Sequence, residues 1–153
     1  MDDESRKAVD SWWQFKFTWT GVFALVAILG IIVAVAIPSY GDYVHRSQAS
    51  EAVSILGGAK TPLAEYFSEF KRWPKTLGEV SVPTSGKYTL SAAISKGAGG
   101  NGELEITATM RTEGVDRRVA GQTVRMVSTD GGNTWACRPG TMPPKNLPGA
   151  CRD

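Results

Sequence analysis

The feature that most constrains this chain is an apolar run near its beginning. No charged residue occurs between Phe17 and Gly41, and no polar side chain occurs between Gly21 and Ile37. As a helix, residues 17–37 would rise by roughly 30 Å, which is the thickness of the hydrocarbon core of a bilayer. The sequence therefore predicts a membrane-spanning helix.

Two other interpretations of this run stay open. A cleaved secretory signal also has a basic lead and an apolar middle, but no small-x-small cleavage site closes this run. A buried helix of a soluble core is rarely this long without a charge. Aromatic residues gather just before the run, as they do at a membrane interface: Trp12, Trp13, Phe15, Phe17 and Trp19. We therefore expect a helix that is retained in the membrane.

Charges and cysteines predict the orientation of that helix. Arg6, Lys7 and Lys16 precede the run, and cationic flanks favour the cytoplasm. Cys137 and Cys151 are the only two cysteines. They either form a disulfide that closes a short loop, which suits an oxidising compartment, or remain two free buried thiols. We expect the N-terminus in the cytoplasm and the bulk of the chain outside it.

Beyond Pro38 the apolar spacing predicts that the helix continues to about Arg72. Asp42 and Arg46, four residues apart with the acid first, are expected to pair on its surface. His45, the only histidine, is expected at the surface as well. Apolar residues recur at steps of three and four: Tyr40, Val44, Ala49, Ala52, Val53, Leu56, Ala59, Leu63, Phe67 and Phe70.

After the helix the apolar period changes to that of strands. Alternation predicts two strands over residues 88–94 and 104–110, joined by the Gly-rich hairpin loop KGAGGNG. Residues 122–128 and 134–138 supply two more strands. We expect an α+β fold in which an antiparallel four-stranded sheet lays its apolar face on the amphipathic half of the helix. On the first strand, the apolar side chains in alternation are Tyr88, Leu90, Ala92 and Ile94.

Three segments in this order resemble a type IV pilin of the major-subunit kind. They are the apolar helix entering AIPSYGDYVHRSQASEA, then GAKTPLAEYF, then STDGGNTWACRPGTMPPKNLPGACRD. The resemblance implies a ladle-shaped subunit whose long N-terminal helix packs against other pilins in a filament core, with a disulfide loop at 137–151. It also implies the domains: 1–16 as cytoplasmic leader, 17–38 as transmembrane half of the helix, 39–72 as its amphipathic half, and 73–153 as the globular β domain.

The processing site departs from the family pattern that the resemblance implies. In that pattern, pilins are cut after a glycine to expose a phenylalanine that becomes N-methylated, and a glutamate four residues later meets the new amine of a neighbouring subunit. Here Phe17 matches, but Lys16 replaces the glycine and Gly21 replaces the glutamate. We therefore expect a single-pass protein of the bacterial inner membrane with its C-terminal domain in the periplasm, which reaches the pilus and cell surface if it is processed.

The remaining residues argue against an enzyme. A single histidine cannot supply a His-rich metal site, two cysteines fall short of a structural zinc site, and GAGGNG lacks the lysine of a phosphate loop. We expect a non-enzymatic structural protein of a pilus system, either a filament subunit or a pilin-like accessory retained in the membrane, without cofactor, metal or small-molecule substrate. Its expected partners are other pilin subunits through the N-terminal helix, the inner membrane and the pilus assembly machinery.

The alternative function is a binding module for adhesion or DNA uptake. Arg111, Arg117, Arg118 and Arg125 would then form a basic strip that, with the disulfide loop, contacts DNA or another acidic surface. The net charge of +2 is too small to argue for a polyanion partner by itself. Acidic residues are also interleaved with these arginines, as on a solvated face: Glu103, Glu105, Glu113 and Asp116.

Overall fold

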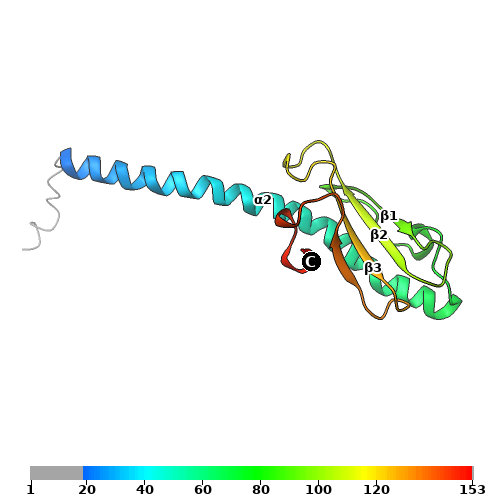
Figure 1. Ribbon diagram of the computed structural model, residues 1–153. Coiled ribbons are helices and arrows are strands. Elements are labelled where there is room, and N and C mark those ends of the chain that lie inside the picture. Colours follow the sequence, from blue (N-terminus) through cyan, green and yellow to red (C-terminus); the bar gives the residue numbers. More distant parts are fainter. Residues whose placement is uncertain (1–18, 153) are drawn as a thin grey trace, which may run out of the picture. The chain divides into compact units, whose positions relative to one another are not determined.

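A computed structural model describes residues 19–152, with the backbone alone at residues 38 and 39. The chain divides into two compact units between Tyr40 and Gly41, and one long helix contributes to both (Figure 1). The elements are α2 (Trp19–Phe70), β1 (Thr89–Lys96), β2 (Leu104–Met110), β3 (Thr123–Ser128) and β4 (Ala136–Pro139), with short 3-10 turns at Leu77–Val80, Pro144–Asn146 and Gly149–Cys151.

The described part of the first unit is the helical segment 19–40. It is rich in β-branched residues, which ordinarily lower helix propensity. A helix satisfies all of its interior backbone hydrogen bonds within one segment, and this is what an apolar surrounding demands. The helical state of this segment therefore agrees with an apolar environment.

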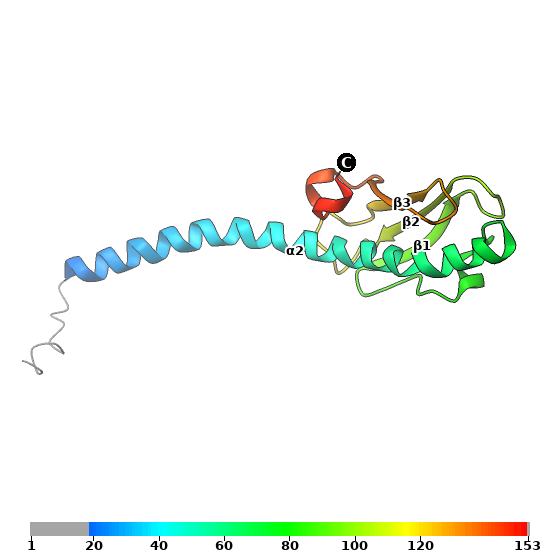
Figure 2. The same ribbon diagram turned by 90° about the horizontal axis from the view of Figure 1, so that it is seen from below.

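In the second unit, an antiparallel sheet packs on α2. Its strand order is β1-β2-β3-β4, so each strand pairs with its neighbour in the sequence. Figure 2 shows the sheet lying along one side of the helix. This arrangement confirms the expected fold, including the hairpin between β1 and β2.

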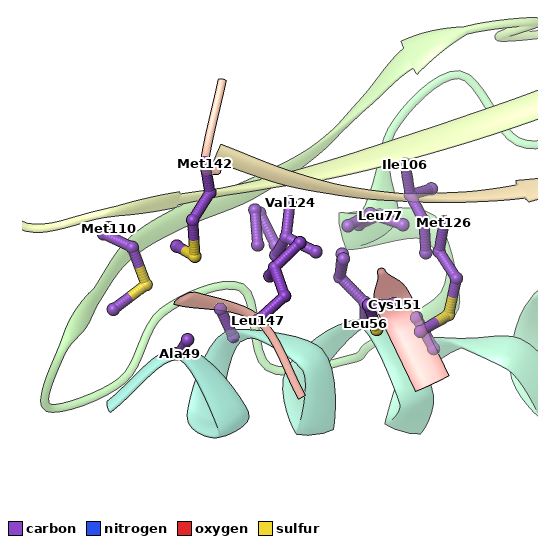
Figure 3. Packing of buried hydrophobic residues seen from close by; sticks show 14 of the residues in the cluster. Ala49, Leu56, Leu77, Ile106, Met110, Val124, Met126, Met142, Leu147 and Cys151 are labelled. Carbon is purple, nitrogen blue, oxygen red and sulfur yellow. The ribbon is translucent and has the colours of Figure 1, made fainter. Parts of the chain in front are cut away.

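The core of this unit lies between the sheet and residues 49–63 of α2. Ile106 and Met126 are cross-strand partners on β2 and β3, and both side chains point toward the helix, where Leu56 lies (Figure 3). The predicted apolar face of the helix is buried in its middle and exposed at its ends, where Tyr40 and Phe70 are 70% and 48% exposed. The fully buried helix positions are Ala49, Ala52, Leu56, Ala59 and Leu63.

A register shift in β1 overturns one expectation. Thr89 pairs with Met110 and Ser91 pairs with Thr109, so Leu90 is an extra residue on its strand. An extra residue reverses which side of the sheet the preceding positions face. Thr89 is therefore fully buried, whereas Leu90 is 50% exposed. The assignment of Leu90 to the apolar face was wrong.

Trp73 fastens the β1–β2 hairpin loop to the end of α2. Its backbone N–H donates to the Gly100 carbonyl and its indole Nε1–H donates to the Gly102 carbonyl, both at 2.7 Å. The ring packs on Phe67 with centroids 4.5 Å apart. The helix ends at Phe70, close to the expected Arg72, and the next residue takes a left-handed conformation that stops it.

Candidate functional site

The apolar run of α2 is exposed along its described length. Phe23, Ile31 and Ile37 expose 68%, 66% and 67% of their surface. The most apolar window of the helix has a mean hydropathy of 2.8, and none of that window is buried within the chain. By length and composition, this is the one helix in the described residues that is able to cross a membrane. Such a surface requires lipid or other protein helices to cover it.

Of the three atypical processing positions, the structure describes Gly21. This residue lies within α2 and is exposed. Since it has no side chain, it offers no carboxylate at the place where the family pattern has one. Lys16 and Phe17 lie outside the described residues.

A polar cluster surrounds the first helical turn of the second unit. The Arg118 guanidinium donates from Nη1 to Asp42 Oδ1 at 2.7 Å and lies 3.1 Å from His45 Nδ1. The same His45 nitrogen lies 2.9 Å from the Gly41 carbonyl oxygen. His45 is only 2% exposed, so its expected surface position was wrong. Asp42 pairs with Arg118 and not with Arg46, because the connection between β2 and β3 packs against this turn.

Glu51 joins the helix to the start of β1. Its Oε1 accepts hydrogen bonds from the backbone N–H groups of Tyr88 at 2.8 Å and Thr89 at 2.9 Å. Burial of the carboxylate raises its pKa, but these hydrogen bonds outweigh burial and hold the pKa of Glu51 below its ordinary value. Gly86 leaves room for the carboxylate, since a Cβ at that position would collide with Glu51 Oε1.

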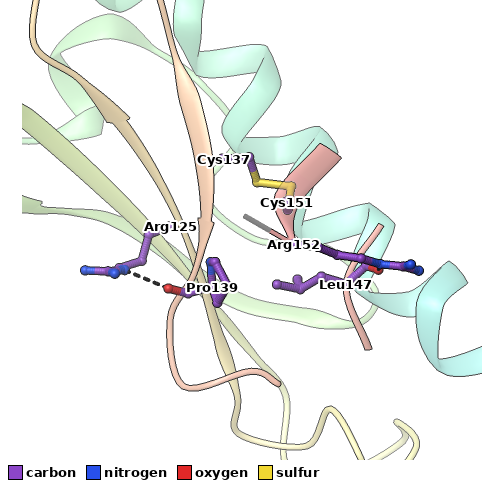
Figure 4. Close-up of a disulfide and its surroundings, with 6 residues drawn as sticks. All are labelled: Arg125, Cys137, Pro139, Leu147, Cys151 and Arg152. Atoms are coloured by element: carbon purple, nitrogen blue, oxygen red, sulfur yellow. Dashed lines mark hydrogen bonds between the residues drawn. A yellow bond between two sulfur atoms is a disulfide. The ribbon is translucent and has the colours of Figure 1, made fainter. Parts of the chain in front are cut away.

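The four arginines of the candidate basic strip have different surroundings. Arg117 is exposed, and within the described residues it makes no side-chain hydrogen bond or ion pair. The other three are engaged with separate acceptors. These are the Gly86 carbonyl for Arg111, Asp42 for Arg118, and Glu105 with the Pro139 carbonyl for Arg125 (Figure 4).

A disulfide joins Cys137 on β4 to Cys151 near the C-terminus (Figure 4). Cys151 is fully buried against the core, and Cys137 packs beside it. The bond ties the proline-rich segment to the edge of the sheet, as the resemblance implied. Prolines remove backbone donors from this segment, so the covalent link and the buried side chains of Met142 and Leu147 hold it in place.

The described residues offer no site for a metal ion. No group of three or more His, Cys, Asp or Glu side chains comes together among residues 19–152.

Comparisons with known proteins agree with this architecture. Residues 45–152 match the family described as Pilin (bacterial filament). The chain is 40% identical over 144 residues to Fimbrial protein EcpC of Eikenella corrodens, covering 92% of each chain. It is 30% identical over 165 residues to Type IV major pilin protein PilE of Neisseria gonorrhoeae, covering 92% of this chain and 95% of that one. A third relative, Type IV major fimbrial protein FimA of Dichelobacter nodosus, is 37% identical over 95 residues, which are 60% of this chain and 59% of its own length.

The family match covers more than half of the chain and includes the buried part of α2, the whole sheet and the disulfide loop. Two relatives of at least 30% identity extend the similarity over nearly the whole length. Members of this family are structural, non-enzymatic subunits that assemble with one another into type IV pili. The chain belongs to the type IV pilin family.

Proposed function

We propose that this pilin works from the inner membrane, with residues 1–16 uncleaved in the cytoplasm, residues 17–38 across the bilayer and the second unit in the periplasm. There it packs its apolar helix on other pilins and binds, stores or regulates the major subunit. The exposed apolar run of α2 supports this proposal, because lipid and other pilin helices both suit its surface.

The observation that carries the proposal is a paired departure at the processing site. Lys16 stands at the cleavage position, and Gly21 stands where the partner of the new amine would lie. Both departures concern the same chemistry. Without cleavage there is no amine to pair, and a glutamate in hydrocarbon would then be an uncompensated charge. A glycine at position 21 is therefore the residue expected of an uncleaved chain.

An uncleaved leader would also oppose entry into a filament. The leader carries seven charged side chains, and each unpaired ion that is buried costs on the order of several kcal/mol after relaxation. Those residues are Asp2, Asp3, Glu4, Arg6, Lys7, Asp10 and Lys16. A chain that keeps them is more stable in a bilayer, where the leader remains in water.

A second candidate is an ordinary filament subunit at the cell surface. The names of the relatives favour it, since they are called fimbrial proteins or major pilins. This role requires that the peptidase cut between Lys16 and Phe17 and that the filament core tolerate Gly21. The two candidates therefore differ in the N-terminus of the mature protein.

Intact-mass measurement of the protein extracted from native membranes separates them. We expect a chain that retains residues 1–16. A pilin with glycine at its cleavage position, extracted from the same membranes, is the control and should be trimmed and methylated. A population that begins at N-methylated Phe17 would overturn membrane retention and establish the filament-subunit role.

A further inference from the structure

One end of the second unit gathers five cationic side chains from three separate segments, and we call them the basic collar: Arg46, Arg117, Arg118, Lys145 and Arg152. Contacts hold these segments together. Arg46 Nε donates to the Lys145 carbonyl at 3.2 Å, and Asn146 Nδ2 donates to the Arg118 carbonyl at 3.0 Å. Figure 1 shows the C-terminal segment and the β2–β3 connection at the end of this unit where its part of α2 begins.

Within residues 19–152, Arg118 is the one collar cation that forms an ion pair. Asp42 and Asp116 both pair with Arg118, at 2.7 Å and 3.9 Å. Within residues 19–152, the other four collar cations have no acidic group within ion-pair distance. Arg46 and Arg152 each donate through Nε to a backbone carbonyl, and their outer Nη groups make no hydrogen bond to another described residue. The exposed side chains of Arg117 and Lys145 make no hydrogen bond or ion pair there.

The collar is a local feature and not the mark of a generally basic protein. The whole chain has a net charge of only +2. The three segments that supply the collar, residues 41–50, 111–121 and 140–153, contain six Lys or Arg and four Asp or Glu, so their net charge of +2 equals that of the whole chain. The collar cations come from three segments of the chain. They are therefore better suited to an extended anionic surface than to a single small anion.

The collar lies close in the sequence to the apolar run. From Ile37 to Arg46 a helix rises by about 14 Å. Exposed Tyr40 and Tyr43, at 70% and 71%, fall between them, and tyrosine is enriched at the membrane–water interface. The headgroup layer is about 5–7 Å thick on each side, and charge acts over a further ~8 Å at physiological salt. Arg46 is therefore within reach of headgroups once the run spans a bilayer.

We propose that the basic collar binds anionic phospholipid headgroups at the periplasmic face of the inner membrane. This inference rests on the proposed function, in which the helix stays in the bilayer. Juxtamembrane cations are attracted to anionic lipid in proportion to their number. The contact orients the second unit on the membrane and has to be released before the pilin can enter a filament.

Hydrogen exchange of the full chain in lipid nanodiscs tests the proposal. One set of discs contains phosphatidylcholine alone, and the other contains phosphatidylcholine with about one-third phosphatidylglycerol. Amides of residues 112–121 and 141–152 should exchange about threefold more slowly in the anionic discs, while the hairpin loop 97–103 should not change. High salt should remove the difference, because exposed charges are screened. Equal exchange in the two kinds of disc overturns the proposal.

Two matched double variants test whether the lipid-dependent protection from exchange depends on the collar. Arg117→Gln with Lys145→Gln removes two collar charges whose side chains make no described hydrogen bond, so folding should be retained. Lys71→Gln with Lys75→Gln removes two exposed charges beyond the C-terminal end of α2. The first variant should lose at least half of the lipid-dependent protection, and the second should keep it. Equal loss in both variants would reject the collar as the binding surface.

Two further arms separate lipid from other anions, both in phosphatidylcholine discs. In these discs, either inorganic phosphate or a DNA duplex is added. If one of them protects the same amides and phosphatidylglycerol does not, the ligand of the collar is that anion and the proposal is overturned. Because reconstitution places the helix in a bilayer whatever its processing in cells, a negative result here leaves membrane retention intact. Conversely, trimming at Phe17 in cells would reject retention without changing the result in discs.

Discussion

Glu51 shows how one side chain fixes the relation between the helix and the sheet in the second unit. Its carboxylate accepts two backbone N–H groups at the start of β1, where a bulge follows. Hydrogen bonds to a charged group are stronger than neutral ones, and buried donors that lose their acceptor are costly. Glu51 therefore contributes more to the stability of the second unit than its partly exposed position on the helix suggests.

Replacement of Glu51 should lower stability and change its pH dependence. Since the folded pKa lies below the ordinary value of 4.5, the stabilisation is present above that value and is lost as the pH falls through the folded pKa. We expect Glu51→Ala to cost about 1–3 kcal/mol at pH 7. Glu51→Gln should cost less and flatten the decline in stability below about pH 4.5. Urea unfolding between pH 7 and pH 3 measures both effects. If the stability of Glu51→Gln falls below about pH 4.5 as steeply as that of the parent, Glu51 is not the group responsible for this decline.

Two glycines should respond in opposite directions to alanine. Gly132 has φ of +92°, and a Cβ there would lie 2.8 Å from Ala64 Cβ, so Gly132→Ala should destabilise by more than about 1 kcal/mol. Gly58 lies within α2 with nothing near its Cβ position. Gly58→Ala should therefore stabilise by about 0.5–1 kcal/mol. Thermal unfolding of the two variants beside the parent measures this, and a shift of the same sign in both would refute the argument.

Several contacts of single residues could not be predicted from the sequence. Asp42 precedes Arg46 by four residues, a spacing that predicts an ion pair on a helix. In the structure it pairs instead with Arg118 from the β2–β3 connection. His45 is buried by the same connection. Both depend on segments far apart in the chain, and local spacing carries no information about them. The bulge at Leu90 is likewise decided by pairing with β2, so alternation alone placed that side chain on the wrong face.

At the scale of elements the sequence was a better guide. The change from a helical to an alternating apolar period predicted one helix and four strands, and the Gly-rich loop predicted the first hairpin. These signals are strong because each is repeated over many residues. The limits of the buried face of α2 are less well determined by pattern, since Tyr40 and Phe70 continue the apolar spacing but are exposed.

The disulfide should stabilise the C-terminal element more than the rest of the unit. The bond closes the loop from Cys137 to Cys151, and a loop of about 15 residues corresponds to roughly 3 kcal/mol in the chain-entropy estimate. We expect Cys137→Ser with Cys151→Ser to lower the free energy of unfolding by at most that amount. Hydrogen exchange should increase first in residues 141–152, while β2 stays protected. Thiol labelling of the folded parent should fail at both cysteines, and quantitative labelling would show that they are free.

The two units of the molecule suit different surroundings, one apolar and one aqueous. The described part of the first unit exposes an uninterrupted apolar helix, whereas the second unit buries its own core and exposes charged and polar side chains. The second unit therefore has its own core, and the helix of the first requires a cover that residues 19–152 do not supply. In the function proposed above, residues 16 and 21 decide whether lipid or other pilins provide the cover.

Restoration of the family pattern at these two positions should move the protein from the membrane to filaments. Lys16→Gly supplies a cleavable junction, and Gly21→Glu supplies the partner of the new amine. Gly21→Glu alone would place an unpaired carboxylate in the helix, at a depth-dependent cost of up to ~3 kcal/mol.

Lys16→Gly alone would permit cutting but leave the amine without its glutamate. We therefore expect the double variant to appear in sheared surface filaments far more than either single variant or the parent. Immunoblots of sheared and membrane fractions, from cells with a working pilus machine, measure this distribution. If the parent already occupies the sheared fraction at the level of a major pilin, the membrane-retention proposal is wrong and the protein is an ordinary filament subunit.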